Sequence, residues 1–178
     1  TYNNAITLSG GIGGGSIGVA VTNIEDQAHT NAELSNAVLT SDGDIFSSVK
    51  VLANNNTHLE TELSSDSLSI SIGGSVGIAV ENVNMEAQTG VSVLDTQLGT
   101  AERQFDYFDA KANSKLYNKF QNVDVAAGSL LGVAVGKGAI NMNGQTMATV
   151  DTTAAYAKDI DVWAHETRTT DATMVGVS

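Results

Sequence analysis

The chain has 178 residues, a formal net charge of −12 and neither Pro nor Cys. Twenty acidic residues against eight basic ones make a surface that repels phosphates and anionic membranes, and no apolar run approaches the ~20 residues of a membrane helix. We therefore expect no nucleic-acid binding and no direct membrane insertion, and a core built from Val, Ile, Leu, Ala and Gly, because aromatic residues are only 5% of the total.

One segment occurs twice almost unchanged and a third time in weaker form. Gly-Gly-Ser-Ile-Gly-Val-Ala-Val at 14–21 returns as Gly-Gly-Ser-Val-Gly-Ile-Ala-Val at 73–80, and then as Gly-Ser-Leu-Leu-Gly-Val-Ala-Val at 128–135. A fourth copy is interpreted as starting at 174–178. A catalytic centre is built once per domain, whereas a structural unit is stacked many times, so the repeat predicts an elongated scaffold.

The repeat divides the chain into units of similar length when it is anchored on Gly18, Gly77 and Gly132. The second interval between these anchors is slightly shorter than the first. The whole chain, 1–178, is then one continuous segment. Its predicted units are 14–72, 73–127 and 128–173.

Within each unit the apolar residues alternate over short segments, which is the periodicity of β-strands. Residues typical of turns separate these segments. Asn54 and Asn113 are expected in turns where Asn side chains form a ladder along the axis. Ala20, Ala79 and Ala134 are expected to point into a narrow core. The alternating segments are 30–34, 49–53, 68–72, 89–93, 146–150 and 160–164, and the turn-like segments are 41–44, 54–56, 136–138 and 143–144.

The stretch 102–121 supports two interpretations. Its apolar residues recur near helical spacing, at Phe105, Phe108, Ala112, Leu116 and Phe120, and Lys111, Lys115 and Lys119 do the same on another face. The repeat alignment, however, matches Ala112-Asn113 with Ala53-Asn54, where the predicted strand 49–53 ends. A register shared between units outweighs a local pattern, so we predict a strand.

Many short strands with small apolar residues predict an all-β fold, a parallel β-helix or β-solenoid. A whole repeat unit is too long for one coil of three short strands, so three coils of roughly 20 residues per unit are expected. The chain would then form about eight or nine coils, a rod about 40 Å long at ~4.8 Å per coil. A β-sandwich is the rival fold, but it gives no reason for the repeat.

The motif Gly-Gly-Ser-Val-Gly-Ile-Ala-Val-x-Asn at 73–82, followed by Ala-x-Thr and then Val-x-Ala-Asn, resembles the repeats of giant bacterial surface adhesins. The nearest group is the leukotoxin-like filamentous adhesins of the autotransporter type, related to filamentous haemagglutinin. The resemblance covers about residues 10–178, with 101–121 and the shortened third unit departing from it. It implies a secreted, right-handed β-helix at the bacterial cell surface, whose partners are proteins or glycans of a host or neighbouring cell. It assigns no binding residues.

Two motifs imitate catalytic chemistry. Ser16 and Ser75 each lie in a Gly-x-Ser-x-Gly pattern, but a nucleophile elbow needs a following helix, and an enzyme does not need two. These glycines are interpreted as structural. His29, His58 and His165 lie far apart in the sequence and none of them belongs to a closely spaced His pair, so they do not indicate a metal site.

Carboxylates provide the remaining candidates. Residues 42–44 and the group Glu60, Glu62 and Asp66 could offer oxygen atoms to Ca²⁺, but neither matches a known calcium loop, so no cofactor is expected beyond that option. Glu60 and Glu62 alternate as acids do in polysaccharide-degrading β-helices, yet Arg103 and Arg168 are the only arginines available for subsites.

Trp163 is the single binding candidate. It lies between Val162 and Ala164, so it takes the outward side of its strand, where it could stack on a sugar ring. The leading hypothesis is a non-enzymatic stalk or filament segment of a secreted adhesin. The alternatives are an enzyme acting on polysaccharide and a fibre subunit that associates end to end through its coil ends.

Overall fold

The computed structural model describes residues 16–41, 47–68, 74–127 and 131–177, and all regular structure within these ranges is β-strand. Six long strands and three very short ones follow one another along these described ranges. They are β1 (Ser16–Ser35), β2 (Val38–Leu39), β3 (Ser48–Leu68), β4 (Gly74–Leu94), β5 (Gln97–Leu98), β6 (Phe105–Ala127), β7 (Leu131–Asp151), β8 (Ala154–Ala155) and β9 (Ala157–Val177).

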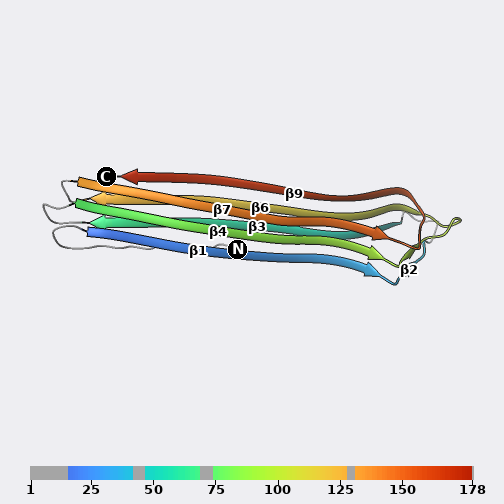
Figure 1. Ribbon diagram of the computed structural model, residues 1–178. Coiled ribbons are helices and arrows are strands. Elements are labelled where there is room, and N and C mark those ends of the chain that lie inside the picture. The colour runs from blue at the N-terminus through green and yellow to red at the C-terminus, as the bar shows by residue number, and fades with distance from the viewer. Residues whose placement is uncertain (1–15, 42–46, 69–73, 128–130, 178) are drawn as a thin grey trace.

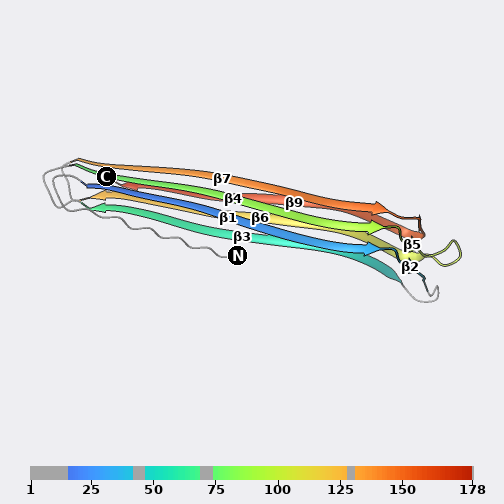
Figure 2. The same ribbon diagram turned by 60° about the horizontal axis from the view of Figure 1, so that its bottom comes forward.

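The strands form three parallel sheets of three strands each, in the orders β1-β4-β7, β2-β5-β8 and β3-β6-β9. The chain runs along one long sheet, turns through a short corner strand and returns along the other long sheet. Figures 1 and 2 show the two long sheets lying face to face in a thin body whose long dimension follows the strands. The predicted all-β, parallel architecture is confirmed, and it is consistent with a β-solenoid.

The predicted number of coils was wrong. Ser16 lies opposite Ser75, its equivalent in the next unit, so one whole repeat unit makes one coil, and the described residues form three rungs in each sheet. The error came from the turn-like segments 54–56, 136–138 and 143–144, which lie inside β3 and β7. At about 3.3 Å per residue the long strands extend about 70 Å, whereas three rungs extend only about 14 Å.

The register agrees with the repeat alignment except at the third glycine anchor. Thr30, Thr89 and Thr146 lie in one row, as the alignment predicts. Gly77, however, pairs with Gly18 and Ala134, and Gly132 lies opposite Ser75. The motif of the third unit is therefore displaced by two positions, an even number that leaves every side chain on its original face.

This displacement changes the expected alanine row. Ala79 pairs with Ala20 and with Gly136, and its side chain is fully buried. Ala134 lies one row away, opposite Gly77. The prediction that a fourth copy of the motif starts at Met174 is also wrong. Met174 belongs to β9 and pairs with Asn122 of β6, so it lies in the β3-β6-β9 sheet, whereas the described residues of the three copies of the motif lie in the β1-β4-β7 sheet.

Glycine occurs inside β7 where the opposing sheet occupies the space of a side chain. A Cβ atom on Gly138 would overlap the ring of Phe120, and one on Gly144 would overlap the Glu166 carboxylate. The actual corners use Asn36 and Asp95, whose φ angles of 51° and 48° lie in the left-handed region that Asn and Asp tolerate. Residue types that usually form turns therefore have two roles in this chain: Gly makes room for the facing sheet inside β7, and Asn and Asp form the corners.

The stretch 102–121 contributes to β6, so the strand interpretation is confirmed. Apolar residues at every fourth position, such as Phe108, Ala112, Leu116 and Phe120, fit both the strand period of two and the helix period of 3.6. The positions between them are Ala110, Ser114 and Asn118, which are also buried. The inward alternation is therefore complete, but polar residues conceal it in the sequence.

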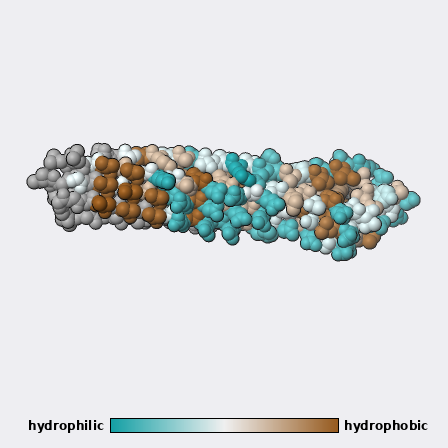
Figure 3. All heavy atoms as spheres, viewed as in Figure 1, coloured by the Kyte–Doolittle hydropathy of each residue, from teal (hydrophilic) through white to brown (hydrophobic). Residues whose placement is uncertain are grey.

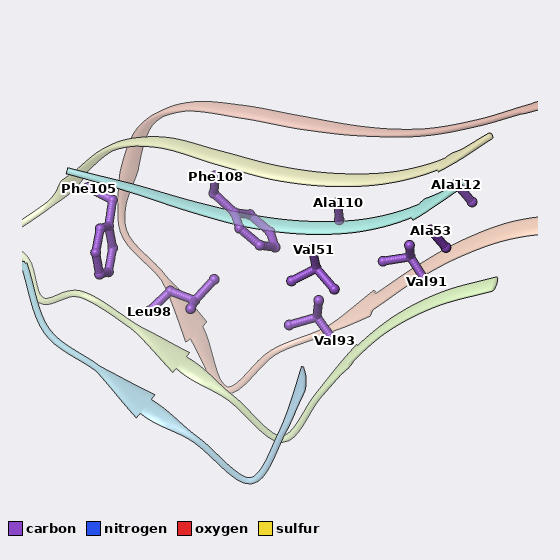
Figure 4. Close-up of a cluster of buried hydrophobic side chains, with 9 residues drawn as sticks. All are labelled: Val51, Ala53, Val91, Val93, Leu98, Phe105, Phe108, Ala110 and Ala112. Atoms are coloured by element: carbon purple, nitrogen blue, oxygen red, sulfur yellow. The ribbon is translucent and has the colours of Figure 1, made fainter. Parts of the chain in front are cut away.

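The interior contains two apolar clusters. The first lies next to the corner strands and includes Val51, Val93, Leu98 and Phe108 (Figure 4). The second lies further along the sheets around Leu59, Met85, Leu116 and Phe120. Buried polar side chains also line the interior, with Asn55 Nδ2 donating to Ser114 Oγ at 3.4 Å and Thr57 Oγ1 donating to Asn55 Oδ1 at 3.2 Å.

Candidate functional site

The outward face of the β3-β6-β9 sheet gathers charged and aromatic side chains in parallel rows, and we call it the charged face. One row contains Lys50, Asp109 and Asp161, and the next contains Leu52, Lys111 and Trp163. The rows form because residues of equal register stack at the strand spacing, and because odd and even positions of a strand point to opposite faces. Side chains from three coils therefore meet on one surface.

Lys111 is the centre of this arrangement. Its Nζ atom lies 2.7 Å from Asp161 Oδ2 and 3.1 Å from Asp109 Oδ1, and Lys50 Nζ lies 3.8 Å from the other Asp109 oxygen. The hydrogen bonds to Asp161 and Asp109 raise the pKa of the Lys111 ammonium group. Lys111 therefore remains charged at physiological pH and bridges a carboxylate of its own coil, Asp109, to one of the next coil, Asp161.

A groove of about 420 Å³ lies beside these charges on the same face. It presents carboxylates, ammonium groups, a hydroxyl group and an aromatic ring, the mixture that recognises hydroxylated or charged ligands. Its lining residues are Ser48, Lys50, Tyr107, Asp109, Lys111, Asp159, Ile160 and Asp161.

Trp163, the predicted binding residue, lies on this outward face in register with Lys111 and is 39% exposed. It does not line the groove, although Lys111 beside it does. Its ring meets His165 edge to face at a centroid distance of 6.2 Å. An indole ring next to a fixed ammonium–carboxylate cluster provides an apolar surface and polar partners within one site.

The row beyond Trp163 corrects the expected asparagine turns. Asn54, Asn113 and His165 pair in register in the middle of β3, β6 and β9, so the two asparagines lie on a flat strand face. The two equivalent Asn residues are neighbours in register on the outward face and not at a corner.

Further along the same face lie the predicted acids. Glu60 occupies a row with Lys119 and Asp171, and Glu62 occupies the next outward row with Gln121 and Thr173. His58 Nε2 lies 3.2 Å from Glu60 Oε1, and the His58 ring stacks on Tyr117 at 4.5 Å. Glu60 and Glu62 do share one strand face, with Lys119 and His58 next to Glu60 and with Gln121 next to Glu62.

The other candidate residues do not converge. Ser16, the first residue of β1, pairs with Ser75 near the start of β4, and a strand follows each of them, so neither precedes a helix. His29 lies in β1 opposite Gln88, on the other long sheet from His58 and His165. Asp66 lies in β3. Residues 42–44, the other calcium candidate, lie outside the described residues.

The described ranges contain no cluster of three or more His, Asp or Glu side chains that could hold a metal ion. Within the same ranges no helix is long and apolar enough to cross a membrane. Arg103 and Arg168, the two arginines, lie apart from the groove: Arg103 follows the corner strand β5, and Arg168 donates to the carbonyl oxygen atoms of Met142 at 2.9 Å and Gly144 at 3.2 Å.

The Lys111 cluster and its groove were not found from the sequence. The signal was present, because Asp109 and Lys111 alternate along one segment, as do Asp159, Asp161 and Trp163 along another. Aligning the two segments through Ala112 and Ala164 brings these residues into adjacent rows. No protein-family model, curated protein or solved structure matches the chain.

Proposed function

We propose that the chain is a non-enzymatic structural segment of a secreted bacterial surface adhesin, a right-handed β-solenoid that carries a contact surface on its charged face. The observation behind this proposal is the repeated register: one repeat unit returns the chain to the same row in both long sheets and at the corner. A fold in which each unit contacts chiefly its neighbours serves extension and display rather than the enclosure of a substrate.

The arrangement of polar groups supports display over catalysis. Acyl transfer requires a nucleophile, a base and oxyanion donors around one point, and glycoside hydrolysis requires two acids across a substrate cleft. Ser75 lies within a strand, and Glu60 and Glu62 lie on one flat strand face. The resemblance to filamentous adhesins adds the extracellular location and the expected partner, a protein or glycan of another cell.

Trp163 and the Lys111 cluster are the contact region that this proposal favours. Sugar rings stack on exposed indole rings, and their hydroxyl groups bond to carboxylates and ammonium groups such as those of Asp161 and Lys111. Each contact is weak, so binding would depend on many copies displayed together. In a glycan array, we expect Trp163→Ala to remove binding, whereas Met147→Ala, an exposed residue on the other long sheet, should leave it unchanged.

The scaffold assignment is tested by adding a coil. Inserting a second copy of Val38–Thr96 after Thr96 adds one repeat unit in register, since Val38 pairs with Gln97. Because stability in stacked repeats grows with each interface, the longer chain should keep its β-sheet spectrum and melt at a higher temperature. A longer chain that melts earlier or loses its β-structure would contradict the solenoid.

The non-enzymatic assignment requires a separate test. The chain is incubated with a panel of polysaccharides and ester substrates, and the incubation is repeated with Glu60→Gln and Ser75→Ala. We expect no turnover by any of the three proteins. Turnover that one of these substitutions abolishes would replace the scaffold with an enzyme.

A further inference from the structure

The most unusual surface of the molecule is a block of aliphatic side chains on the outward face of the β1-β4-β7 sheet. Two complete rows across the three coils contain only Val and Ile, and we call them the aliphatic patch: Ile17, Val76 and Val133, then Val19, Ile78 and Val135. Val21 and Val80 extend it in the next row. Figure 3 shows the patch as a block of hydrophobic residues near the end where β1, β4 and β7 begin.

These side chains are exposed to solvent. Ile17 is 75% exposed, Val19 is 52% and Val133 is 52%, while the residues of the central strand are partly covered by their neighbours. Inward residues of the same strands, such as Ala79, already form the core. The aliphatic rows are therefore not a consequence of core packing.

The internal repeat shows that the patch is maintained. Val or Ile occupies all six positions of the two rows, whereas other outward rows of this sheet change from coil to coil, as in His29, Gln88 and Gln145. The third motif is displaced by two positions, but the aliphatic character of the two rows is preserved. Val133 lies opposite Val76 and Val135 lies opposite Ile78, so the outward side chains of the third coil are still aliphatic. Each coil has kept an apolar outward surface at the same place.

The chemistry of the patch selects its partner. It is a flat face of β-branched side chains with no aromatic ring, and Lys137 is its one adjoining cation, so it lacks the Trp, Tyr and basic residues by which proteins bind membrane interfaces. It has no hydroxyl or carboxylate to recognise a sugar. A flat apolar sheet face is complementary to a second flat sheet face, as in sheets that pack about 10 Å apart.

We propose that two copies of this chain dimerise face to face through the aliphatic patch, with the β1-β4-β7 sheets forming the interface. The same surface on two copies is self-complementary under a twofold axis, which closes the assembly as a dimer. The patch also contains no charge, so it is a place where two molecules of net charge −12 can approach closely.

The available area indicates a weak dimer. The exposed parts of the aliphatic side chains come to roughly 400–500 Å² per copy, near the upper limit for apolar patches on monomers. Two copies with the neighbouring Asn row, in which Asn82 Nδ2 donates to Asn23 Oδ1 at 2.8 Å, would bury about 1,000 Å² in total, the lower limit for a specific interface. We expect a dissociation constant on the order of 10⁻⁵ to 10⁻⁴ M.

The first test is analytical ultracentrifugation of the chain over a range that spans this dissociation constant. We expect a monomer–dimer equilibrium that strengthens as salt is raised, because salt screens the repulsion between two acidic molecules. The triple variant Val19→Thr/Ile78→Thr/Val135→Thr should weaken dimerisation at least tenfold. The control Leu52→Thr/Met147→Thr changes exposed apolar residues elsewhere and should dimerise as the unsubstituted chain does.

A second test locates the interface and does not depend on the triple variant remaining folded. The chain has no cysteine, so Ile78→Cys and Gln88→Cys each introduce a single thiol on the outward side of β4. Under mild oxidation, Ile78→Cys at the patch should form a disulfide-linked dimer much faster than Gln88→Cys, which lies further along the strand.

Three outcomes would overturn the proposal. The first is a chain that stays monomeric throughout the concentration range, and the second is a dimer that neither the Thr variant nor the position of the thiol affects. The third is co-sedimentation with neutral phosphatidylcholine vesicles that the Thr variant abolishes, which would make the patch a lipid contact. All of these readouts are independent of substrate turnover and of glycan binding, so they do not test the proposed function.

Discussion

Glu81 is expected to destabilise the folded chain at neutral pH, and its replacement by Gln should therefore be stabilising. Its side chain points inward from β4 and is 1% exposed, in a row with Thr22 and Gly138. Neither carboxylate oxygen has a hydrogen-bond partner. Burial raises the pKa of the Glu81 carboxyl group, an effect that the nearby Thr61 hydroxyl partly offsets.

The magnitude follows from the cost of an unpaired buried group. Leaving such a polar group unsatisfied costs about 1–3 kcal/mol, and more when the group is charged. Glu81→Gln keeps the shape and removes the charge, while the new amide can donate to the Thr61 hydroxyl group. We expect Glu81→Gln to raise the free energy of unfolding by about 1–2 kcal/mol at pH 7.

The pH dependence has a definite sign. Because the pKa of Glu81 is raised on folding, the folded state binds its proton more tightly than the unfolded state. The stability that this tighter proton binding contributes is fully present when the pH is below the ordinary pKa of a Glu carboxyl group. It is lost as the pH rises through the pKa of Glu81 in the folded chain. The advantage of Glu81→Gln should therefore be largest at neutral pH and smallest in acid.

The assay is urea denaturation followed by circular dichroism at pH 4 and pH 7. Glu86→Gln is the matched control, because Glu86 lies on the same strand but on its outward face. The control should behave like the unsubstituted chain at both pH values. An equal or lower stability of Glu81→Gln at pH 7, or a difference that does not shrink in acid, would refute the reasoning.

Three further predictions concern packing and register. Ala79→Leu should lower the free energy of unfolding by about 1–3 kcal/mol in urea denaturation, because the side chain is fully buried and the extra volume overpacks the core. Gly138→Ala should cost about 1–2 kcal/mol in the same assay, because the added Cβ overlaps the buried ring of Phe120. One residue inserted after Asn84 should reverse the faces of the rest of β4 and abolish the cooperative thermal transition, whereas an insertion in 100–104, between β5 and β6, should change the melting temperature little.

The sequence was informative where apolar residues alternate over several positions in equivalent places of the repeat units. The alternation at 30–34 and 89–93 and the row of Ala53, Ala112 and Ala164 all predicted strands in the right register. The same patterns did not reveal the length of the strands. Asn54–Asn56 and Gly136–Gly138 have the composition of turns, and turn propensity is a local quantity that tertiary contacts override.

The physical reason lies in what each of these residues meets in three dimensions. Gly138 is required because Phe120, which belongs to a strand of the facing sheet, occupies the space beside it. Asn54 and Asn113 pair on an outward face although they belong to different coils. Neither relation is visible in a window of a few residues. The sequence therefore predicted which segments form strands, but not how long the strands are, and so not how many coils the chain makes.

The candidate site was predicted to the same partial extent. Trp163 lies on the outward face, as its position between Val162 and Ala164 indicates. Lys111 was noticed only as part of a spacing of four, which suits a helix and a strand equally. Its partnership with Asp109 and Asp161 depends on the register between β6 and β9, and it becomes visible only when the two segments are aligned through Ala112 and Ala164.

Polar contacts between coils also explain how such a repetitive chain holds one register. A strand of Gly, Val and Ala can move by two positions and keep every side chain on its face, and the third motif is displaced by that amount. Asn55 bonding to Ser114, and Asp106 bonding to Ser47 and Lys158, cannot move without losing partners. We infer that these polar contacts, rather than the repeated motif, fix the alignment of neighbouring coils. The motif then determines what lies inside and outside the sheet, and its outward half is the aliphatic patch.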